Sequence, residues 1–174
     1  IFQESDKINL KIENLNRISD NSTREKERTN LEEIVNIAIS EMIMNKVIDT
    51  SRITVEKDLN TEGCYIAINK AKLIEALENL IRNSCEAIEG SGTISISSFY
   101  NTDSITLLIK DTGKGIKREI VKSVMNPFFT TKEHRKAMGI GLTIAQKIIN
   151  SHNGKLILES EENIGTTARI IFYI

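Results

Sequence analysis

Apolar and polar residues repeat along this chain with two different spacings, and each spacing predicts one kind of element. Apolar residues three and four positions apart predict helices, and apolar residues two positions apart predict strands. The helices are expected at residues 31–47, 73–89, 117–124 and 140–150. The strands are expected at residues 53–59, 64–68, 93–100, 104–110, 155–159 and 166–173. Residues 126–138, which contain the chain's only proline, are expected to form a long loop.

The order of these elements predicts the fold class. Pairs of strands alternate with single helices, which favours a mixed or antiparallel sheet with the helices on one face. We therefore expect an α+β protein, built as a two-layer α/β sandwich with a mixed, mostly antiparallel sheet. The sequence contains no internal repeat and no low-complexity tract.

A further helix is expected near the N-terminus, where a narrow apolar stripe runs through polar residues. The stripe consists of Ile8, Ile12, Leu15 and Ile18. It suits packing against another helix, although the frayed end of a chain segment has the same pattern. Polar residues 19–30 follow as a connector, in which Thr29 or Asn30 is placed to cap the next helix. Glu33 is in position to complete a capping box.

The helix predicted at residues 73–89 has one apolar face and one face rich in oxygen. At about 100° per residue, its polar side chains fall within a sector of roughly 80°. They are Glu75, Asn79, Asn83 and Glu86, and the opposite side carries Leu73, Leu77, Leu80, Ile81, Ser84 and Ile88. Such oxygens suit a hard cation such as Mg²⁺. A solvated amphipathic helix has the same pattern, so this segment alone leaves both interpretations open.

Composition and charge narrow the classes of function. The 174 residues are 40% hydrophobic and 27% charged, and a net charge of −1 provides no basic excess for nucleic acid or an anionic membrane. No apolar run approaches the ~18 residues that a membrane-spanning helix needs. Cys64 and Cys85 lack the spacing of a zinc site or a disulfide framework, and we expect both to be small buried residues in a reducing compartment. Because the chain begins with Ile1, we expect a segment of a longer protein.

Two glycine motifs lie beside predicted elements in positions where they can bind a nucleotide. In DTGKGI, at residues 111–116, the Asp111 carboxylate ends an apolar strand and can accept a hydrogen bond from an exocyclic amine such as that of adenine. The glycines let a flat ring approach the backbone. AMGIGL, at residues 137–142, precedes a helix whose first N–H groups attract phosphate. A tight turn and a flexible hinge are the ordinary alternatives.

Two further motifs complete the set. NPFFTTK, at residues 126–132, places two aromatic residues and Lys132 in a loop. The loop either closes on a ligand, with Lys132 reaching a terminal phosphate, or lies on the surface with its Phe side chains plugging the core. GTT, at residues 165–167, opens the last strand, where Thr166 either supports Asp111 or simply follows a β-turn.

In this order, the Asn face, DTGKGI, NPFFTTK, MGIGL and GTT resemble the N, G1, F, G2 and G3 boxes of the histidine-kinase ATPase domain. That domain has the Bergerat nucleotide-binding fold of the GHKL superfamily, which gyrase-type topoisomerases and mismatch-repair ATPases share. The FFTTK and ENLIRNSCEAI forms are similar to the nitrogen-regulator and sporulation-kinase branch. The resemblance covers roughly residues 29–174, and it implies that residues 1–28 are the end of a dimerisation helix with its connector.

The resemblance also implies a role for each matching residue. Asn83 is expected to be the principal Mg²⁺ ligand, and Asn79 a second contact to the metal or the phosphates. Asp111 is expected to bind the adenine amino group, with Thr166 completing the pocket through water. Lys132 is expected to take part in catalysis together with both asparagines. The whole set expected to bind ATP is Asn79, Asn83, Glu86, Asp111, Gly113, Gly115, Ile116, Phe129, Thr130, Thr131, Lys132, Gly139, Ile140, Gly141, Leu142 and Thr166.

Three residues differ from patterns in the superfamily. Asn79 stands where the wider superfamily has a glutamate that activates water, and an amide cannot act as that base. This favours phosphotransfer over hydrolysis. Ala137 replaces the first glycine of the phosphate loop, and its methyl group is expected to restrict the conformations of the lid. Thr112 replaces the commoner Asn of DNGxG, which bears on the geometry of the local turn.

The function implied is that of a cytoplasmic, ATP- and Mg²⁺-dependent protein-histidine kinase domain whose phosphoacceptor lies outside this chain. Neither His134, in the expected lid, nor His152, before the Asn153-Gly154 turn, has the helical context of a phosphoacceptor. The implied partners are a response regulator and the histidine-bearing helical domain of a homodimeric parent, membrane-anchored or not. No nucleic acid and no membrane contact by this segment are expected. The alternatives are a GHKL serine kinase or ATPase of the anti-sigma type, and a nucleotide-sensing interaction module without phosphotransfer.

Overall fold

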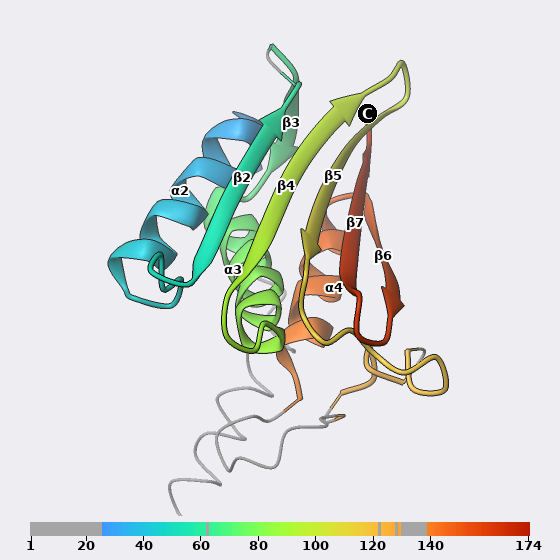
Figure 1. Cartoon of the computed structure of the whole chain (residues 1–174). Coiled ribbons are helices and arrows are strands. Elements are labelled where there is room, and N and C mark those ends of the chain that lie inside the picture. The colour runs from blue at the N-terminus through green and yellow to red at the C-terminus, as the bar shows by residue number, and fades with distance from the viewer. Residues whose placement is uncertain (1–25, 62, 122, 128, 130–138) are drawn as a thin grey trace, which may run out of the picture.

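The computed structural model describes residues 26–61, 63–121, 123–127, 129 and 139–174 of the chain. Its helices are α2 (Leu31–Met44), α3 (Lys70–Ala87) and α4 (Gly141–Ser151). Its strands are β1 (Glu27–Asn30), β2 (Ile53–Leu59), β3 (Tyr65–Ile68), β4 (Gly92–Tyr100), β5 (Ser104–Asp111), β6 (Gly154–Glu161) and β7 (Gly165–Tyr173). Figure 1 shows the helices side by side on one face of the main sheet. The N-terminal helix expected around residues 8–18 lies outside the described residues.

The main sheet has five strands in the order β2-β4-β5-β7-β6. β2 and β4 run parallel, and the other three neighbouring pairs run antiparallel. The predicted α+β sandwich with a mixed, mostly antiparallel sheet is therefore confirmed. The hairpin of β4 and β5 is also confirmed, and Asn101 closes its turn by accepting hydrogen bonds from the N–H groups of Asp103 and Ser104.

The strands at residues 53–59 and 65–68 follow each other in the chain but do not pair. β2 joins β4 in the main sheet, and β3 pairs with β1 in a separate two-stranded sheet. The sequence did not predict β1, because this short strand has mostly exposed side chains and therefore no alternation of apolar residues. The sequence also did not predict which strands pair with each other, since strand pairing depends on contacts between segments far apart in the chain.

The core lies between the main sheet and the helices. β5 contributes Ile105, Leu107 and Ile109 from alternate positions, and all three are essentially inaccessible. α3 packs toward them with the side that was predicted to be apolar: Leu73, Leu77, Leu80, Ile81 and Ser84 are buried, as is Ile88 just beyond the helix. Each fully buried Leu or Ile stabilises the fold by roughly 1.5–3 kcal/mol. This burial fixes the rotation of α3 about its axis, and with it the direction of the polar face.

The ends of the helices depend on caps that apolar spacing does not reveal. α3 begins at Lys70, three residues before the predicted start, because the Asn69 side chain caps it by accepting a hydrogen bond from the Lys72 N–H at 3.0 Å. Asn30 caps α2 through the Glu32 N–H, as predicted. The predicted capping box is wrong, since the Glu33 carboxylate instead pairs with Lys70.

The short helix predicted at residues 117–124 is also wrong. Its described residues form successive turns, in which the Lys117 carbonyl accepts hydrogen bonds from the N–H groups of both Ile120 and Val121. A segment of this length gains too few helical hydrogen bonds to offset the cost of starting a helix. Only residues 126, 127 and 129 of the long loop predicted up to residue 138 are described. None of the described helices is long and apolar enough to span a membrane.

Candidate functional site

The Asp111 carboxylate lies at the end of β5, where the chain leaves the sheet. It is 3% exposed, and its Oδ1 accepts hydrogen bonds from the Gly113 N–H at 2.9 Å and from the Thr166 N–H at 3.2 Å. Burial raises the pKa of this carboxyl above its ordinary value. The two N–H groups, together with the Ser84 side chain from α3, offset that rise only in part. A buried carboxylate oriented in this way is suited to accept hydrogen bonds from a ligand.

The loop after Asp111 packs tightly between α3 and the hairpin of β6 and β7. A Cβ atom on Gly113 would lie 2.7 Å from the Ala87 carbonyl oxygen. Gly115 has a φ of +66°, and a Cβ there would lie 2.0 Å from the Glu161 carbonyl oxygen. Both positions therefore require glycine, the second for its backbone conformation as well as for space. The two glycines of DTGKGI thus bring the Asp111 strand, the end of α3 and the last hairpin together.

Ser160 of β6 connects this loop to the start of β7. Its hydroxyl accepts a hydrogen bond from the Ile116 N–H at 2.9 Å and donates one to the Gly165 carbonyl at 2.9 Å. The same oxygen lies 2.9 Å from Thr166 Oγ1. Thr166 is therefore held next to Asp111, which agrees with one of the two interpretations that the sequence left open. Ser160 was missed, because a single serine within a strand carries no sequence signal.

Thr112, the residue at which DTGKGI differs from the DNGxG pattern, binds the neighbouring strand β4. Its N–H donates to the Thr93 carbonyl at 3.1 Å, and its Oγ1 accepts from the Thr93 N–H at 3.0 Å. The side chain is exposed and lies away from the buried carboxylate of Asp111. Thr112 thus holds the turn after β5 against the start of β4 through both its backbone and its side chain.

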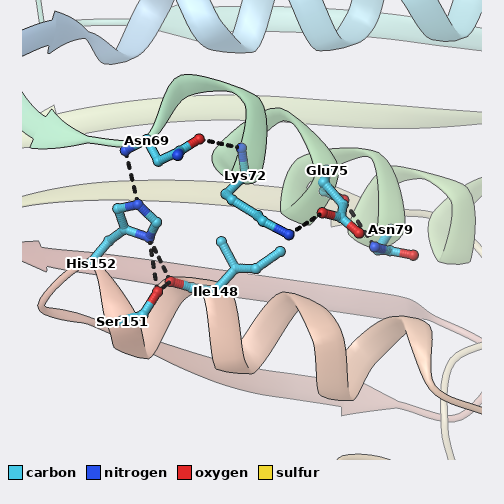
Figure 2. Close-up of polar contacts among 7 residues, drawn as sticks. All are labelled: Asn69, Lys72, Glu75, Asn79, Ile148, Ser151 and His152. Atoms are coloured by element: carbon cyan, nitrogen blue, oxygen red, sulfur yellow. Dashed lines mark hydrogen bonds and ion pairs between the residues drawn. The ribbon is translucent and has the colours of Figure 1, made fainter. Parts of the chain in front are cut away.

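Asn79 on α3 meets the first turn of α4. Its Nδ2 donates to the Glu75 carbonyl at 2.9 Å, so Oδ1 points the other way, toward the C-terminal end of α3 (Figure 2). A Cβ added to Gly141 would lie 2.9 Å from Asn79 Oδ1. The absence of a side chain at Gly141 therefore makes room for the carboxamide, and the predicted Asn face and the predicted phosphate loop adjoin one another.

The start of α4 offers N–H groups to a ligand. In the described part of the chain no side chain caps this helix, and its first helical hydrogen bond runs from the Ile144 N–H to the Ile140 carbonyl. Gly139 precedes it with a φ of +65°. Ile140 is buried and Leu142 packs against the core, so both anchor the turn through apolar contacts. Unpaired N–H groups at the positive end of a helix dipole attract anions such as phosphate.

Asn83 and Glu86 lie further along the polar face of α3. Asn83 is half-buried, and its carboxamide makes no hydrogen bond to any residue that the structure describes. Glu86 is exposed. Within the described ranges there is no cluster of three or more His, Cys, Asp or Glu side chains able to hold a metal ion by themselves. Asn83 is therefore the polar group on this face that is free to accept a ligand contact.

The expected lid is described only at its edges. Phe129 is half-buried and its N–H donates to the Asn126 carbonyl at 3.2 Å. Thr143 Oγ1 of α4 donates to the Met125 carbonyl at 3.3 Å, which ties the start of this loop to the phosphate end of the site. The remaining expected residues Thr130, Thr131 and Lys132 lie outside the described residues, as do His134 and Ala137.

His152 is the C-cap of α4 and is buried. Its Nε2 accepts a hydrogen bond from the Asn69 N–H at 2.9 Å, and its Nδ1 lies 2.7 Å from the Ile148 carbonyl oxygen. Both ring nitrogens are thus occupied by contacts within the fold. Cys85 is buried and Cys64 half-buried, and both are free thiols.

The predicted site residues that the structure describes therefore gather at one end of the molecule. This end is formed by the C-terminal half of α3, the start of α4, the end of β5 and the turn between β6 and β7, all in the lower part of Figure 1. A buried acceptor lies at the Asp111 side, and at the α3 and α4 side lie the carboxamides of Asn79 and Asn83 and a helix start that no described side chain caps. The arrangement suits a ligand with a flat amine-bearing ring at one end and a metal-bound polyphosphate at the other.

Sequence comparisons reveal several similar proteins. The family model described as "Histidine kinase-, DNA gyrase B-, and HSP90-like ATPase" matches residues 68–174, more than half of the chain. Sporulation kinase C of Bacillus subtilis is 30% identical, over 98% of this chain and 39% of that protein. The signal transduction histidine-protein kinase AtoS of Escherichia coli is 29% identical, over 100% of this chain and 28% of that protein. The chain thus spans well under half the length of these relatives.

Solved structures share the fold. The nucleotide-free catalytic domain of histidine kinase ThkA is 26% identical with a TM-score of 0.72, over 86% of this chain and 96% of that chain. Full-length ShkA, solved in complex with AMPPNP, has a TM-score of 0.77 over 92% of this chain and 34% of that chain. Its identity is 15%, so that likeness is one of fold alone.

Proposed function

This chain belongs to the family of histidine kinase-, DNA gyrase B- and HSP90-like ATPases, and from that premise we propose that it is the ATP-binding catalytic domain of a two-component sensor histidine kinase. In this role it transfers the γ-phosphate of ATP to a histidine outside residues 1–174. The supporting observation is that the loop after Asp111 packs through Gly113 against the end of α3, while Asn79 of the same helix lies against Gly141 at the start of α4.

Asp111 recognises the base in this proposal. Its carboxylate accepts a hydrogen bond from the adenine amino group while Gly113 and Thr166 hold it in place. Thr166 contributes further through water. Because the carboxylate is already desolvated in the free protein, the ligand gains a hydrogen bond to a charged group without first stripping water from it, and such bonds are worth about 1.5–3 kcal/mol.

The phosphates lie at the start of α4. The N–H groups of its first turn, with Gly139 and Gly141 leaving the backbone accessible, bind phosphate oxygens. Lys132 is assigned to the γ-phosphate on the strength of the FFTTK motif. Holding the triphosphate between the base pocket and α4 positions its terminal group for attack by an incoming histidine, and positioning is the main contribution that a protein makes to this reaction.

Mg²⁺ fits the donor set of this face. Asn83 has a carboxamide that is unpaired among the described residues, and Asn79 directs its Oδ1 toward the start of α4. Mg²⁺ takes oxygen ligands and commonly binds through one or two side chains plus substrate phosphates. Asn83 would be its principal protein ligand and Asn79 a second. When bound, the ion would neutralise charge on the phosphate oxygens.

Phosphotransfer is favoured over hydrolysis because of the chemistry of Asn79. An amide accepts no proton near neutral pH, so it cannot activate water as a general base. Its Nδ2 is moreover committed to the Glu75 carbonyl. The residues that bind ATP therefore leave the γ-phosphate for a nucleophile supplied by another part of the protein.

The proposal extends to the context of the domain. Residues 29–174 form the catalytic unit, and residues 1–28 the end of a dimerisation helix with its connector. The partners are the histidine-bearing helical domain of a homodimeric parent and a response regulator, and the domain works in the cytoplasm. The relatives named as sporulation kinase C and AtoS support this assignment.

The test is a transfer assay with the chain, ATP labelled at the γ-phosphate and a separately added helical domain from a sensor histidine kinase of this branch. We expect label on the histidine of the added domain and none on His134 or His152. Label on a serine would favour a serine kinase, and rapid release of phosphate a hydrolysing ATPase. ATP binding without either reaction would favour a nucleotide-sensing module. Each of these three results would overturn the proposal.

A further inference from the structure

The two helices that carry the candidate site pack along each other, and two close approaches mark the opposite ends of their interface. At the site, Asn79 of α3 lies against Gly141 at the start of α4. At the far end, Asn69 at the start of α3 donates its N–H to His152 at the end of α4. Asn69 and Asn79 are ten residues apart, about 15 Å along a helix, and Gly141 and His152 are eleven apart, about 16 Å. The helices therefore run antiparallel with matched contacts.

His152 makes the far contact in a single protonation state. Its Nδ1 faces the Ile148 carbonyl, which is only an acceptor, so Nδ1 carries the hydrogen. Its Nε2 faces the Asn69 N–H, which is only a donor, so Nε2 carries the lone pair. The structure thus requires the neutral Nδ1–H tautomer. A second proton would sit on Nε2 and break the bond between the helices.

The far contact is also the N-terminal cap of α3. The Asn69 backbone N–H binds His152 while its side chain accepts from the Lys72 N–H, so one residue joins the cap to the end of α4 (Figure 2). Lys72 in turn pairs with Glu75 at 3.6 Å, and the Glu75 carbonyl accepts from Asn79. Contacts along α3 therefore run from His152 to Asn79.

We propose that His152 is a positioning residue for the nucleotide site, whose neutral Nδ1–H tautomer locks α4 to the cap of α3 and so fixes the spacing between Asn79 and the start of α4. This inference rests on the proposed function of that site. His152 touches no part of the site itself and acts only through the two helices.

The surroundings of His152 favour the required state. Burial lowers the pKa of the imidazole, the Ile148 carbonyl opposes this, and the charge of Lys26 lowers it further. Lys26, Tyr65 and Tyr173 line the same cavity as His152, and Lys70 and Lys72 lie in the first turn of α3. Lys70 is paired with Glu33, and Lys26 donates to the Ser151 carbonyl. His152 also lines a cavity of about 330 Å³.

Replacing His152 by Gln or by Asn tests its two hydrogen bonds one at a time. In His152→Gln, the side-chain oxygen Oε1 can take the place of the ring Nε2 and so keep the hydrogen bond from Asn69. In His152→Asn, the shorter side chain places its Nδ2 where the ring Nδ1 was, which keeps only the hydrogen bond to Ile148. We expect the Gln variant to bind Mg-ATP within about threefold of the unmodified chain and the Asn variant about tenfold more weakly, as for other residues that orient ligands indirectly. Thermal unfolding of both variants controls for general loss of structure.

A measurement on the unmodified chain avoids any failure of a variant to fold. Nitrogen NMR of the histidine rings reports the tautomer of His152 and its titration, and His152→Gln assigns the signal against His134. If the neutral ring favours ATP tenfold, linkage requires Mg-ATP to lower the pKa of His152 by about one unit. An Nε2–H tautomer, a pKa unchanged by Mg-ATP, or equal affinity of the two variants would overturn the proposal. Failure of the unmodified chain to bind Mg-ATP would instead overturn the proposed function, while the tautomer would still be read from the same spectra.

Discussion

Asp111 and Thr166 are 55 residues apart in the sequence, yet the Thr166 N–H donates to Asp111 Oδ1 at 3.2 Å. This bond joins the end of β5 to the start of β7 and fixes one oxygen of a buried carboxylate. Gly165 makes the approach possible, because a Cβ there would lie 2.0 Å from the Asp111 carbonyl oxygen. The geometry of the proposed base pocket therefore depends on the fold as a whole rather than on the DTGKGI motif alone.

The substitution Asp111→Asn is expected to weaken Mg-ATP binding about 10- to 100-fold, the value of a hydrogen bond to a charged group. Its Oδ1 can still accept from Gly113 and Thr166, but the second carboxylate oxygen becomes an NH₂ group that faces the donor of the base. Isothermal titration calorimetry measures the change. Asp103→Asn, in the exposed turn of the β4–β5 hairpin, is the matched control and should bind as the unmodified chain does. Equal binding by both variants would refute the assigned role.

The same substitution is expected to make stability less dependent on pH. Because burial raises the pKa of Asp111 in the folded state, the unfolded chain ionises first as pH rises. The contribution of Asp111 to stability is therefore fully present below its ordinary pKa and is lost as pH rises through the higher folded value. Relative to Asp111→Asn, the unmodified chain should lose stability across that window and then stay level. Urea unfolding at a series of acidic to neutral pH values would detect the difference, and a difference with the opposite slope would contradict the assignment.

Asn83→Ala is expected to reduce the effect of Mg²⁺ on ATP binding while leaving the fold intact. The carboxamide has no hydrogen-bond partner among the described residues, so its loss removes no bond seen in the structure, and Ala is the better helix former. We expect affinity for Mg-ATP to fall at least about tenfold and affinity for ATP with chelator to stay the same. Asn36→Ala on α2 serves as the control. If the two nucleotide forms were weakened equally, Asn83 would not be a metal ligand.

Gly141→Ala is expected to weaken Mg-ATP binding while leaving the free energy of unfolding nearly unchanged. Alanine favours a helix over glycine by up to about 1 kcal/mol, but the added methyl group would lie 2.9 Å from Asn79 Oδ1. The carboxamide must then move, and Mg-ATP affinity should fall about tenfold with little change in unfolding free energy. A double-mutant cycle with Asn79→Ala tests the mechanism, because the two losses should not add if they share one cause. Additive losses would count against the proposed contact.

Sequence patterns predicted the parts of the site that depend on local spacing. The 3.6-residue period placed Asn79 and Asn83 on the polar face of α3, and the turn residues placed Asp111 at the end of a strand. These features depend on segments of about twenty residues, in which helix or strand geometry fixes the direction of each side chain. The burial of the opposite face of α3 confirms this reasoning.

Features that depend on contacts between distant segments could not be predicted from the sequence. Ser160 supports the Asp111 loop only because β6 and β7 fold back onto it, and His152 meets Asn69 across 83 residues. The parallel pairing of β2 with β4 likewise joins strands separated by α3. The helix predicted at residues 117–124 failed for a different reason, since apolar spacing over two turns does not supply enough hydrogen bonds to form a helix. The ligand-binding roles of all the expected site residues stay predictions, and Thr130, Thr131 and Lys132 also lie outside the described residues.

The most direct test of a single nucleotide site is amide NMR of the whole chain with and without Mg-ATP. We predict shifts that cluster at Gly113, Thr166 and Gly141 and at the side-chain amides of Asn79 and Asn83, and that require about 10- to 100-fold more Mg-ATP in Asp111→Asn. Shifts absent altogether, or confined to the region around β1 and β3, would contradict the account.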